Sequence, residues 1–182
     1  GSGGRRGPAR ARPRGGRGLG AVCGFGGAAG RRGVALGEFY RGPDETAVDG
    51  GEMLVEIRIP IKANGSSAYE KVERRTGDWA VVSAGAAVWM DGAVISDARV
   101  GLAAVGPNTT GISAISEALR GKEPSEDLYT VAGAIAAESC RPVTDMRGSV
   151  EYKRHLAAEL TKRALRRSVA RIHSAGQETE EI

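Results

Sequence analysis

The stretch that decides the fold is residues 79–105, WAVVSAGAAVWMDGAVISDARVGLAAV. Small and β-branched residues fill the segment from Trp79 to Met90, and such residues suit a strand in a pleated sheet. Asp91-Gly92 follows, a dipeptide favoured in the two-residue turn of a β-hairpin because that turn needs positive φ angles. Ala93-Val94-Ile95 and Asp97–Val105 supply the returning chain. The sequence therefore predicts an antiparallel arrangement here.

Two further strands are predicted upstream. Met53 to Pro60 alternates between a face with Leu54, Glu56 and Arg58 and a face with Val55, Ile57 and Ile59, which predicts a strand with one buried face. After a turn or loop at residues 64–67, the segment from Ala68 to Arg75 predicts a second strand. Side chains two apart lie on one face of a strand, so Tyr69, Lys71 and Glu73 share a face.

Helices are predicted after residue 108. Thr110 is a cap candidate for a helix over residues 111–120, Pro124-Ser125 begins a second helix, and Ser149 begins a third with apolar residues at spacings of three and four. Strands followed by helices indicate an α+β fold. We expect an antiparallel sheet of three to four strands, covered on one face by about three helices.

The N-terminal residues 1–33 are dominated by glycine and arginine. Eight arginines precede Glu38, the first acidic residue, which leaves 18 basic against 22 acidic residues in the remainder. The segment has little apolar surface to offset the entropy of ordering, so we expect a disordered tail, and a frayed polar tail at 174–182. The alternative is a nucleic-acid-binding arm. Phe25 is its only aromatic residue, so we expect no nucleic acid.

Several classes of function lack sequence support. Cys23 and Cys140 form no C-x-x-C pair, and no apolar run approaches the roughly 18 residues of a membrane span. The cytoplasm is the expected compartment. His155 and His173 lie among polar residues, and neither a Ser-His-Asp order nor a Walker motif is present. We therefore expect no self-contained catalytic residues and no metal site.

The candidate binding residues lie in the predicted strand that begins at Ala68. Tyr69 places an aromatic ring two positions from the cation Lys71, and Arg74, Arg75 and Asp78 follow at a turn. A ring and a cation side by side suit a planar, electron-rich or anionic ligand. An ordinary edge strand with solvated charges and one packed tyrosine is the alternative.

Four stretches in order carry a family resemblance. Residues 69–80, YEKVERRTGDWA, resemble the start of the C-terminal domain in the flavin-carrying (medium) subunits of molybdenum hydroxylases of the carbon monoxide dehydrogenase and xanthine dehydrogenase type. Residues 52–60, 98–107 and 145–154 resemble the preceding strand, a later strand and the start of the last helix. The resemblance covers about residues 33–171 and is nearer to the carbon monoxide dehydrogenase branch.

The resemblance implies a bound cofactor, FAD, and residues that contact it. Tyr69 would lie near the isoalloxazine ring, Lys71 would favour the reduced, anionic flavin, and Leu54 matches a position that touches FAD. Arg74, Arg75 and Asp78 would fix the geometry of the turn. Asp145 and Arg147 would cap the last helix or pair with each other.

The resemblance also implies partners and a division of the chain. A large subunit would hold the molybdenum cofactor, and a small subunit would hold two [2Fe-2S] clusters. We expect a remnant of the FAD-binding domain with its connecting strand at 34–62 and the flavoprotein C-terminal α+β domain at 63–173.

The family's two Gly-rich phosphate loops have no clear equivalent; Gly24-Phe25-Gly26-Gly27 is a weak candidate. A truncated product, a fragment or a divergent stand-alone domain is therefore expected, a component of an oxidoreductase that is inactive alone. An assembly or dimerisation module that binds no flavin alone is the alternative.

Overall fold

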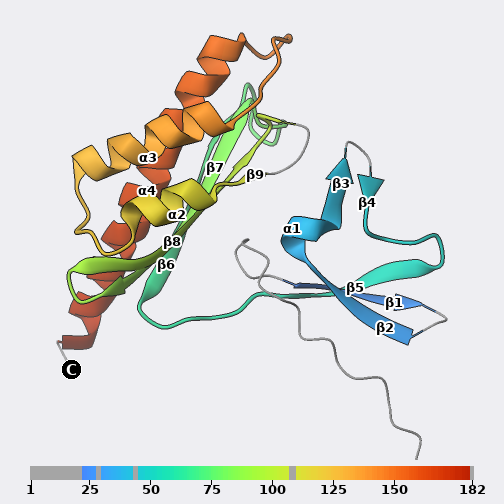
Figure 1. Ribbon diagram of the computed structural model, residues 1–182, viewed down its shortest axis with the longest axis horizontal. Helices are drawn as coiled ribbons and strands as arrows, with labels where there is room; N and C mark the ends of the chain where they lie inside the picture. Colours follow the sequence, from blue (N-terminus) through green and yellow to red (C-terminus); the bar gives the residue numbers. More distant parts are fainter. Residues whose placement is uncertain (1–21, 28–29, 43–44, 107–109, 181–182) are drawn as a thin grey trace, which may run out of the picture.

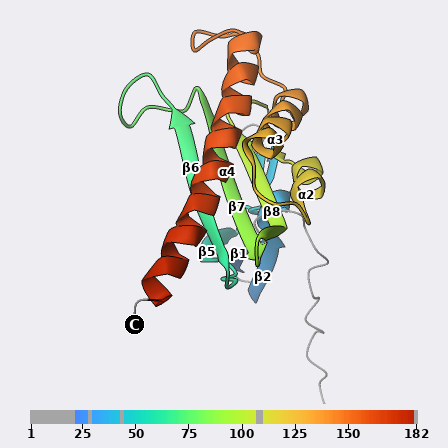
Figure 2. The same cartoon turned by 90° about the vertical axis from the view of Figure 1, so that its left-hand side faces the viewer.

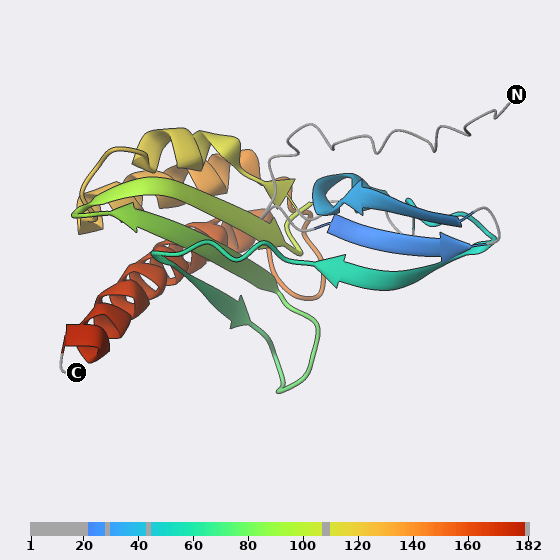
Figure 3. The ribbon, with the colours of Figure 1, turned by 90° about the horizontal axis from the view of Figure 1, so that it is seen from below.

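The structure, a computed structural model, describes residues 22–27, 30–42, 45–106 and 110–180. The chain forms a small β-rich body, followed by a larger body in which helices cover a sheet (Figure 1). Seen from below, the two bodies lie end to end, and the chain passes from one to the other after strand β5 (Figure 3). Residues 59–64 make this connection.

The small body is built around a three-stranded antiparallel sheet. Its strands β1 (Val22–Gly27), β2 (Gly30–Ala35) and β5 (Glu52–Arg58) lie in the order β2-β1-β5. Between β2 and β5 the chain forms the short helix α1 (Leu36–Phe39) and a pair of short strands, β3 (Tyr40–Gly42) and β4 (Glu45–Thr46).

The β1–β2 hairpin corrects the predicted tail. Phe25 and Cys23 alternate along β1 and are buried, and the Phe25 ring stacks on Phe39 with 5.9 Å between centroids. Arg32 lies over the Phe25 ring and forms an ion pair with Glu52 on β5. Because Cys23 and Phe25 are two residues apart on a strand, they lie on the same face and make that face apolar. The glycine- and arginine-rich composition of the segment as a whole does not indicate this. The prediction of disorder was therefore wrong for residues 22–27 and 30–33, while residues 1–21 lie outside the described residues.

Strand β5 forms as predicted, but its burial differs from the prediction. One buried face was expected, but the apolar residues Val55, Ile57 and Ile59 are all exposed, as is Met53. Alternation fixes which side chains share a face, whereas burial depends on what covers that face. Because β5 pairs with β1, the predicted boundary at residue 33 also cuts through one sheet.

The larger body confirms the predicted fold class. Strands β6 (Gly65–Val72), β7 (Val82–Asp91), β8 (Val94–Ala103) and β9 (Thr110–Gly111) form an antiparallel sheet in chain order. Helices α2 (Ser113–Leu119), α3 (Glu126–Ser139) and α4 (Val150–Glu180) gather on one side of it. The long α4 crosses β6 and β7, while α2 lies against β8 (Figure 2).

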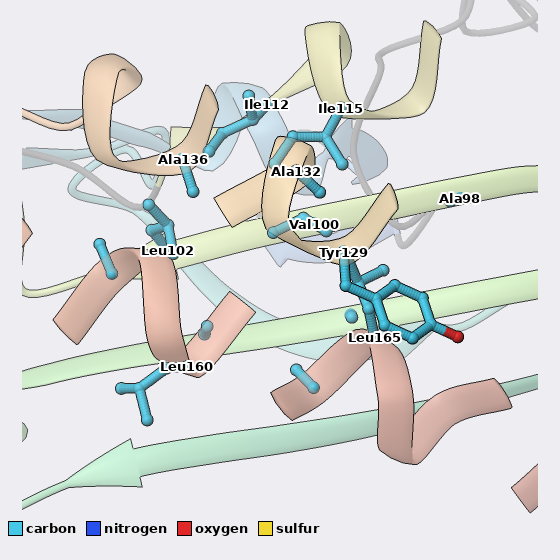
Figure 4. Packing of buried hydrophobic residues seen from close by; sticks show 14 of the residues in the cluster. Ala98, Val100, Leu102, Ile112, Ile115, Tyr129, Ala132, Ala136, Leu160 and Leu165 are labelled. Atoms are coloured by element: carbon cyan, nitrogen blue, oxygen red, sulfur yellow. The ribbon is translucent and has the colours of Figure 1, made fainter. Parts of the chain in front are cut away.

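The core lies between the sheet and the three helices. Val100 and Leu102 on β8 pack against Tyr129 and against small side chains such as Ala132 on α3. Leucines of α4 complete this part of the core (Figure 4). Alanines at many of these positions allow α3 and α4 to approach the sheet and each other closely. Tyr129 is an aromatic residue in a core otherwise filled by Val, Ile, Leu, Ala, Met and Cys140.

The turns and caps agree with the sequence with some exceptions. Gly92 takes a φ of +57° in the predicted hairpin, and Ser125 Oγ accepts from the Leu128 amide at the start of α3. Thr110, however, is part of β9, and Ile112 occupies the N-cap position of α2. Strand β6 begins at Gly65, inside the predicted turn or loop.

The last helix continues beyond its predicted end. Helix α4 runs to Glu180, so residues 174–180 are helical and not a frayed tail, whereas 181–182 lie outside the described residues. Four of residues 175–180 are alanine, glutamine or glutamate, which have favourable helix propensities, and no proline interrupts the segment, although Gly176 and Thr179 are weaker helix formers.

Candidate functional site

Tyr69 and Lys71 lie on the face of β6 that points away from the helices. Ala68, between its exposed neighbours, is buried toward the core, so the period of two along the strand puts Tyr69 and Lys71 on the opposite side. Tyr69 is 60% exposed. We call this side of the β6–β9 sheet the outer face.

Glycine lies beside Tyr69 on the outer face. Gly85 on β7 is its direct partner, and Gly85 is paired in turn with Gly101 on β8 and Gly101 with Gly111 on β9. A row of three glycines therefore crosses the sheet from the Tyr69 ring. Since glycine has no side chain, the outer face carries no side chain at these three positions, next to an exposed aromatic ring.

The Lys71 ammonium is held by two named groups. Its Nζ donates to the carbonyl oxygen of Asp78 at 2.6 Å and forms an ion pair with Oε2 of Glu73. Both partners lie between β6 and β7, within residues 73–80, which we call the 73–80 loop. Lys71 therefore ties the end of β6 to this loop.

The 73–80 loop carries the predicted turn residues. Oδ1 of Asp78 accepts from the Trp79 amide at 2.7 Å, and the Asp78 amide donates to the carbonyl of Arg75 at 3.0 Å. Asp78 thus fixes the local geometry, in agreement with the role inferred for it. Arg74 and Arg75 are exposed, and Trp79 is 80% exposed.

Arg147 reaches this loop from a distant part of the chain. Its Nη2 lies 3.7 Å from Oδ1 of Asp78, and its Nη1 donates to the carbonyl of Ala80 at 3.3 Å. Arg147 also donates its backbone amide to Oδ1 of Asp145, which fits the predicted pairing of these two residues. The contact with the loop was missed, because Arg147 and Asp78 lie far apart in sequence and no local pattern links them.

Leu54 is not on the outer face. It lies on β5 in the small body, directly opposite Phe25, and is 40% exposed. The structure therefore groups two of the three candidate cofactor contacts, Tyr69 and Lys71, and places the third on a different sheet.

The weak phosphate-loop candidate is part of a strand. Gly24-Phe25-Gly26-Gly27 lies within β1, and the Phe25 side chain is fully buried. Its backbone amides and carbonyls pair with β2 and β5 on either side, so the segment is a central strand of the small sheet.

A hollow of about 230 Å³ lies between β8 and α2. Asp97 lines it and accepts from Arg120 at 3.0 Å and from Ser116 at 3.2 Å, with Arg99 at 3.4 Å. Burial raises the pKa of Asp97, but these hydrogen bonds and charges together hold it below its ordinary value. The hollow is thus lined by an acid that already pairs with its basic neighbours, a structural arrangement.

The remaining candidate groups show no active-site chemistry. His155 and His173 are exposed, and Cys140 is buried, with burial raising the pKa of its thiol. Within the described ranges no three His, Cys, Asp or Glu residues gather as metal ligands. In the same ranges, no helix combines the length and the apolar character that a membrane crossing requires.

Comparison with known protein families identifies the larger body. Residues 67–168 match the CO dehydrogenase flavoprotein C-terminal domain. The matched segment begins within β6, includes the 73–80 loop and ends within α4. It therefore contains Tyr69, Lys71, Asp78 and Arg147.

Curated relatives extend the match toward the N-terminus. The chain is 35% identical over 143 residues to the carbon monoxide dehydrogenase medium chain of Hydrogenophaga pseudoflava, covering 78% of this chain and 50% of the relative. It is 29% identical over 139 residues to the glyceraldehyde dehydrogenase medium chain of Sulfolobus acidocaldarius, covering 76% of this chain and 50% of that one. The chain spans about half the length of the curated relatives it matches.

Solved structures agree with both bodies. Carbon monoxide dehydrogenase from Hydrogenophaga pseudoflava superposes with a TM-score of 0.81 at 34% identity, covering 85% of this chain and 54% of that chain. Quinoline 2-oxidoreductase from Pseudomonas putida 86 gives a TM-score of 0.79 at 31% identity, with coverages of 85% and 54%. The chain belongs to the carbon monoxide dehydrogenase flavoprotein (medium-chain) family, whose C-terminal domain it contains.

Proposed function

We propose that the chain is part of the FAD-carrying medium subunit of a molybdenum hydroxylase and that it helps to position the flavin ring. The observation that carries the proposal is the exposed ring of Tyr69 beside the glycine row, with Lys71 on the same strand face. Positions without side chains next to an aromatic ring allow a planar ligand to approach the backbone closely, and a neighbouring cation favours negative charge on that ligand.

The spacing of the two side chains fits a fused ring system. Tyr69 and Lys71 are two residues apart on a strand, so their Cα atoms are separated by roughly 7 Å. The Lys71 ammonium has three N–H donors: one goes to the Asp78 carbonyl, and Glu73 faces the ammonium as an ion-pair partner, which leaves a third direction. The third donor is the one that we assign to the ligand. Leu54 on β5 is proposed to touch FAD from the small body.

Bound FAD would supply two-electron chemistry, accepting electrons and passing them to an acceptor. The task of this chain's residues is to hold and tune that group. The positive charge of Lys71 stabilises negative charge gained on reduction, and Tyr69 limits where the ring can lie. This division assigns no bond-making step to the chain itself.

The names of the relatives suggest the partners. Several are medium chains or medium subunits of dehydrogenases and hydroxylases. We infer a large subunit with the molybdenum cofactor and a small subunit with [2Fe-2S] clusters, from which electrons reach the flavin. The cytoplasm is the proposed compartment, and substrate choice is assigned to the large subunit.

The test is the visible spectrum of the purified chain after incubation with FAD and gel filtration. We expect flavin absorption bands to remain with the protein and to weaken in Tyr69→Leu and Lys71→Met. Tyr152→Leu is the matched control, because Tyr152 is also partly exposed but lies on α4. A chain that stays colourless at excess FAD would contradict the proposal and support an assembly module, docking through exposed residues such as Val55 and Ile57.

A further inference from the structure

We propose that Arg147 is a positioning residue for the Lys71 ammonium and acts through Asp78. The inference rests on the proposed function, because it concerns the group that we assign to the flavin. Arg147 lies in the turn before α4, and its loop acceptor, the carbonyl of Ala80, is 67 positions away in the sequence. A contact of this kind is formed only in the folded molecule.

The first step is the dependence of Lys71 on the 73–80 loop. The loop leaves the sheet after Val72 and returns at Val81, whose amide donates to the Val72 carbonyl at 2.8 Å. Between these points lies Asp78, whose backbone carbonyl accepts a hydrogen bond from Lys71 Nζ. The position of the ammonium therefore follows the conformation of the loop.

The second step is the hold that Arg147 has on the loop. The guanidinium contacts the side chain of Asp78 and the carbonyl of Ala80, on either side of Trp79. Because the guanidinium is planar and rigid, its two contacts, through Nη1 and Nη2, restrain this short backbone segment more strongly than a single contact would. Trp79 itself is largely exposed, so packing of its ring does not replace this hold.

The third step is the rigidity of Arg147 itself. Its amide donates to Oδ1 of Asp145 at 2.8 Å, and Oδ2 of Asp145 pairs with Lys153 Nζ at 2.7 Å. Lys153 is only 2% exposed and also donates to the Val143 carbonyl at 2.8 Å. Since a buried lysine must keep its partners, the turn is fixed to the body of α4. The contacts thus run from α4 through Arg147 and Asp78 to Lys71.

Loss of Arg147 would act on Lys71 in a defined way. Glu73 would remain as an ion-pair partner, but Asp78 would keep only the hydrogen bonds within its own loop and lose the contact that connects the loop to the turn before α4. The ammonium would then spend less time at its position on the outer face. A flavin beside it would lose part of its electrostatic stabilisation in the reduced form, so its midpoint potential would fall.

The first experiment needs no flavin. The chain is treated briefly with acetic anhydride, and acetylation of Lys71 is followed by peptide mass spectrometry. We expect Arg147→Ala to raise the Lys71 rate about fivefold, equivalent to about 1 kcal/mol, because a charged donor is released from its acceptor. Arg147→Lys keeps the positive charge but loses the two-nitrogen geometry of the guanidinium. In this variant the rate of Lys71 acetylation should lie between those of Arg147→Ala and the unaltered protein. The exposed Lys62 serves as the internal reference.

Two further variants keep the first experiment decisive. Asp78→Asn removes the charge that faces Arg147 while keeping the shape of the side chain, and it should raise the Lys71 rate as well, even if Arg147→Ala does not fold. Arg166→Ala is the matched control, because Arg166 pairs with Glu126 away from the loop, and the Lys71 rate should not change. Unchanged Lys71 acetylation in every folded Arg147 and Asp78 variant would overturn the inference.

The second experiment measures the midpoint potential of the bound flavin in the flavin-loaded protein. We expect Arg147→Ala and Lys71→Met each to lower it, and the double variant to show no further fall beyond Lys71→Met. A further fall in the double variant would mean that Arg147 acts by another route and would overturn the inference. An unaltered potential in Lys71→Met, together with altered acetylation in Arg147→Ala, would instead overturn the proposed role of Lys71 at the flavin.

Discussion

Gly85 lies directly across from Tyr69 in the sheet, and a Cβ built on Gly85 would come 3.8 Å from Cδ2 of the Tyr69 ring. The ring therefore stands at ordinary contact distance above a residue without a side chain. Two structural consequences follow: the backbone around Gly85 has room for a methyl group, and the ring of Tyr69 is supported from one side. The strand pairing that creates this arrangement is part of the β6–β7 hairpin.

Gly85→Ala is expected to stabilise the protein. The added methyl group makes a normal van der Waals contact with Tyr69, and removing a glycine from a strand is worth about 0.5–1 kcal/mol. Urea unfolding followed by circular dichroism measures the change. A fall in stability would mean that Tyr69 is held more tightly against the sheet than its exposure indicates.

Gly65→Ala, on the neighbouring strand β6, is expected to destabilise the protein. A Cβ at Gly65 would lie 2.2 Å from Cδ1 of Trp89, too close for both groups to remain in place. The ring is also approached by Lys62 and Arg99, with cation-to-centroid distances of 5.1 and 5.6 Å. We expect a loss of about 1–3 kcal/mol in the free energy of unfolding, as for other overpacked sites. Trp89 fluorescence should change in the variant, and Gly85→Ala is its matched control.

Leu165→Ala tests the packing of α4 on the sheet. Leu165 is fully buried in the core cluster, so its truncation should leave a cavity and cost about 2–5 kcal/mol. Val131→Ala on α3 is the control, because half of that side chain is already exposed and its loss should stay within about 0.5 kcal/mol. Equal losses in the two variants, measured by urea unfolding, would contradict the described core.

Glu52 and Arg32 give a pH-dependent test of the small body. The hydrogen bond from Arg32 lowers the pKa of Glu52 to about 2, aided by the Asp49 amide. Because the folded-state pKa is depressed, the pair stabilises the protein above the ordinary pKa of glutamate, and this contribution disappears as the pH falls through the folded-state value.

Arg32→Ala should therefore move the pKa of Glu52 upward toward 4.5, as measured by carboxyl-carbon NMR titration. The carboxylate of Glu56 is the internal control, since its hydrogen-bond partner is Arg58. A Glu52 pKa that is the same with and without Arg32 would show that the Arg32 side chain on β2 does not reach Glu52 on β5 in solution as described.

The elements that were predicted well depend on local rules. The hairpin at Asp91-Gly92 follows from turn chemistry, and the start of α3 follows from the cap at Ser125. The common face of Tyr69 and Lys71 follows from the period of the strand alone. The elements that were predicted wrongly depend on contacts with residues that are distant in the sequence. Strand β1 is ordered because the Phe25 ring packs on Phe39. Thr110 pairs with Leu102 on β8 and is therefore not a helix cap.

The sequence by itself determined the family, the α+β class and the common strand face of Tyr69 and Lys71, the two side chains that we propose lie at the flavin. These features are carried by residue types at short spacings, which local backbone geometry converts directly into faces and turns. Only the tertiary structure decided that three glycines form a row beside Tyr69 and that Arg147 contacts Asp78, whose carbonyl accepts from Lys71. Both depend on pairing between distant segments, whose register and contacts are set by packing of the whole domain and not by neighbours in the chain.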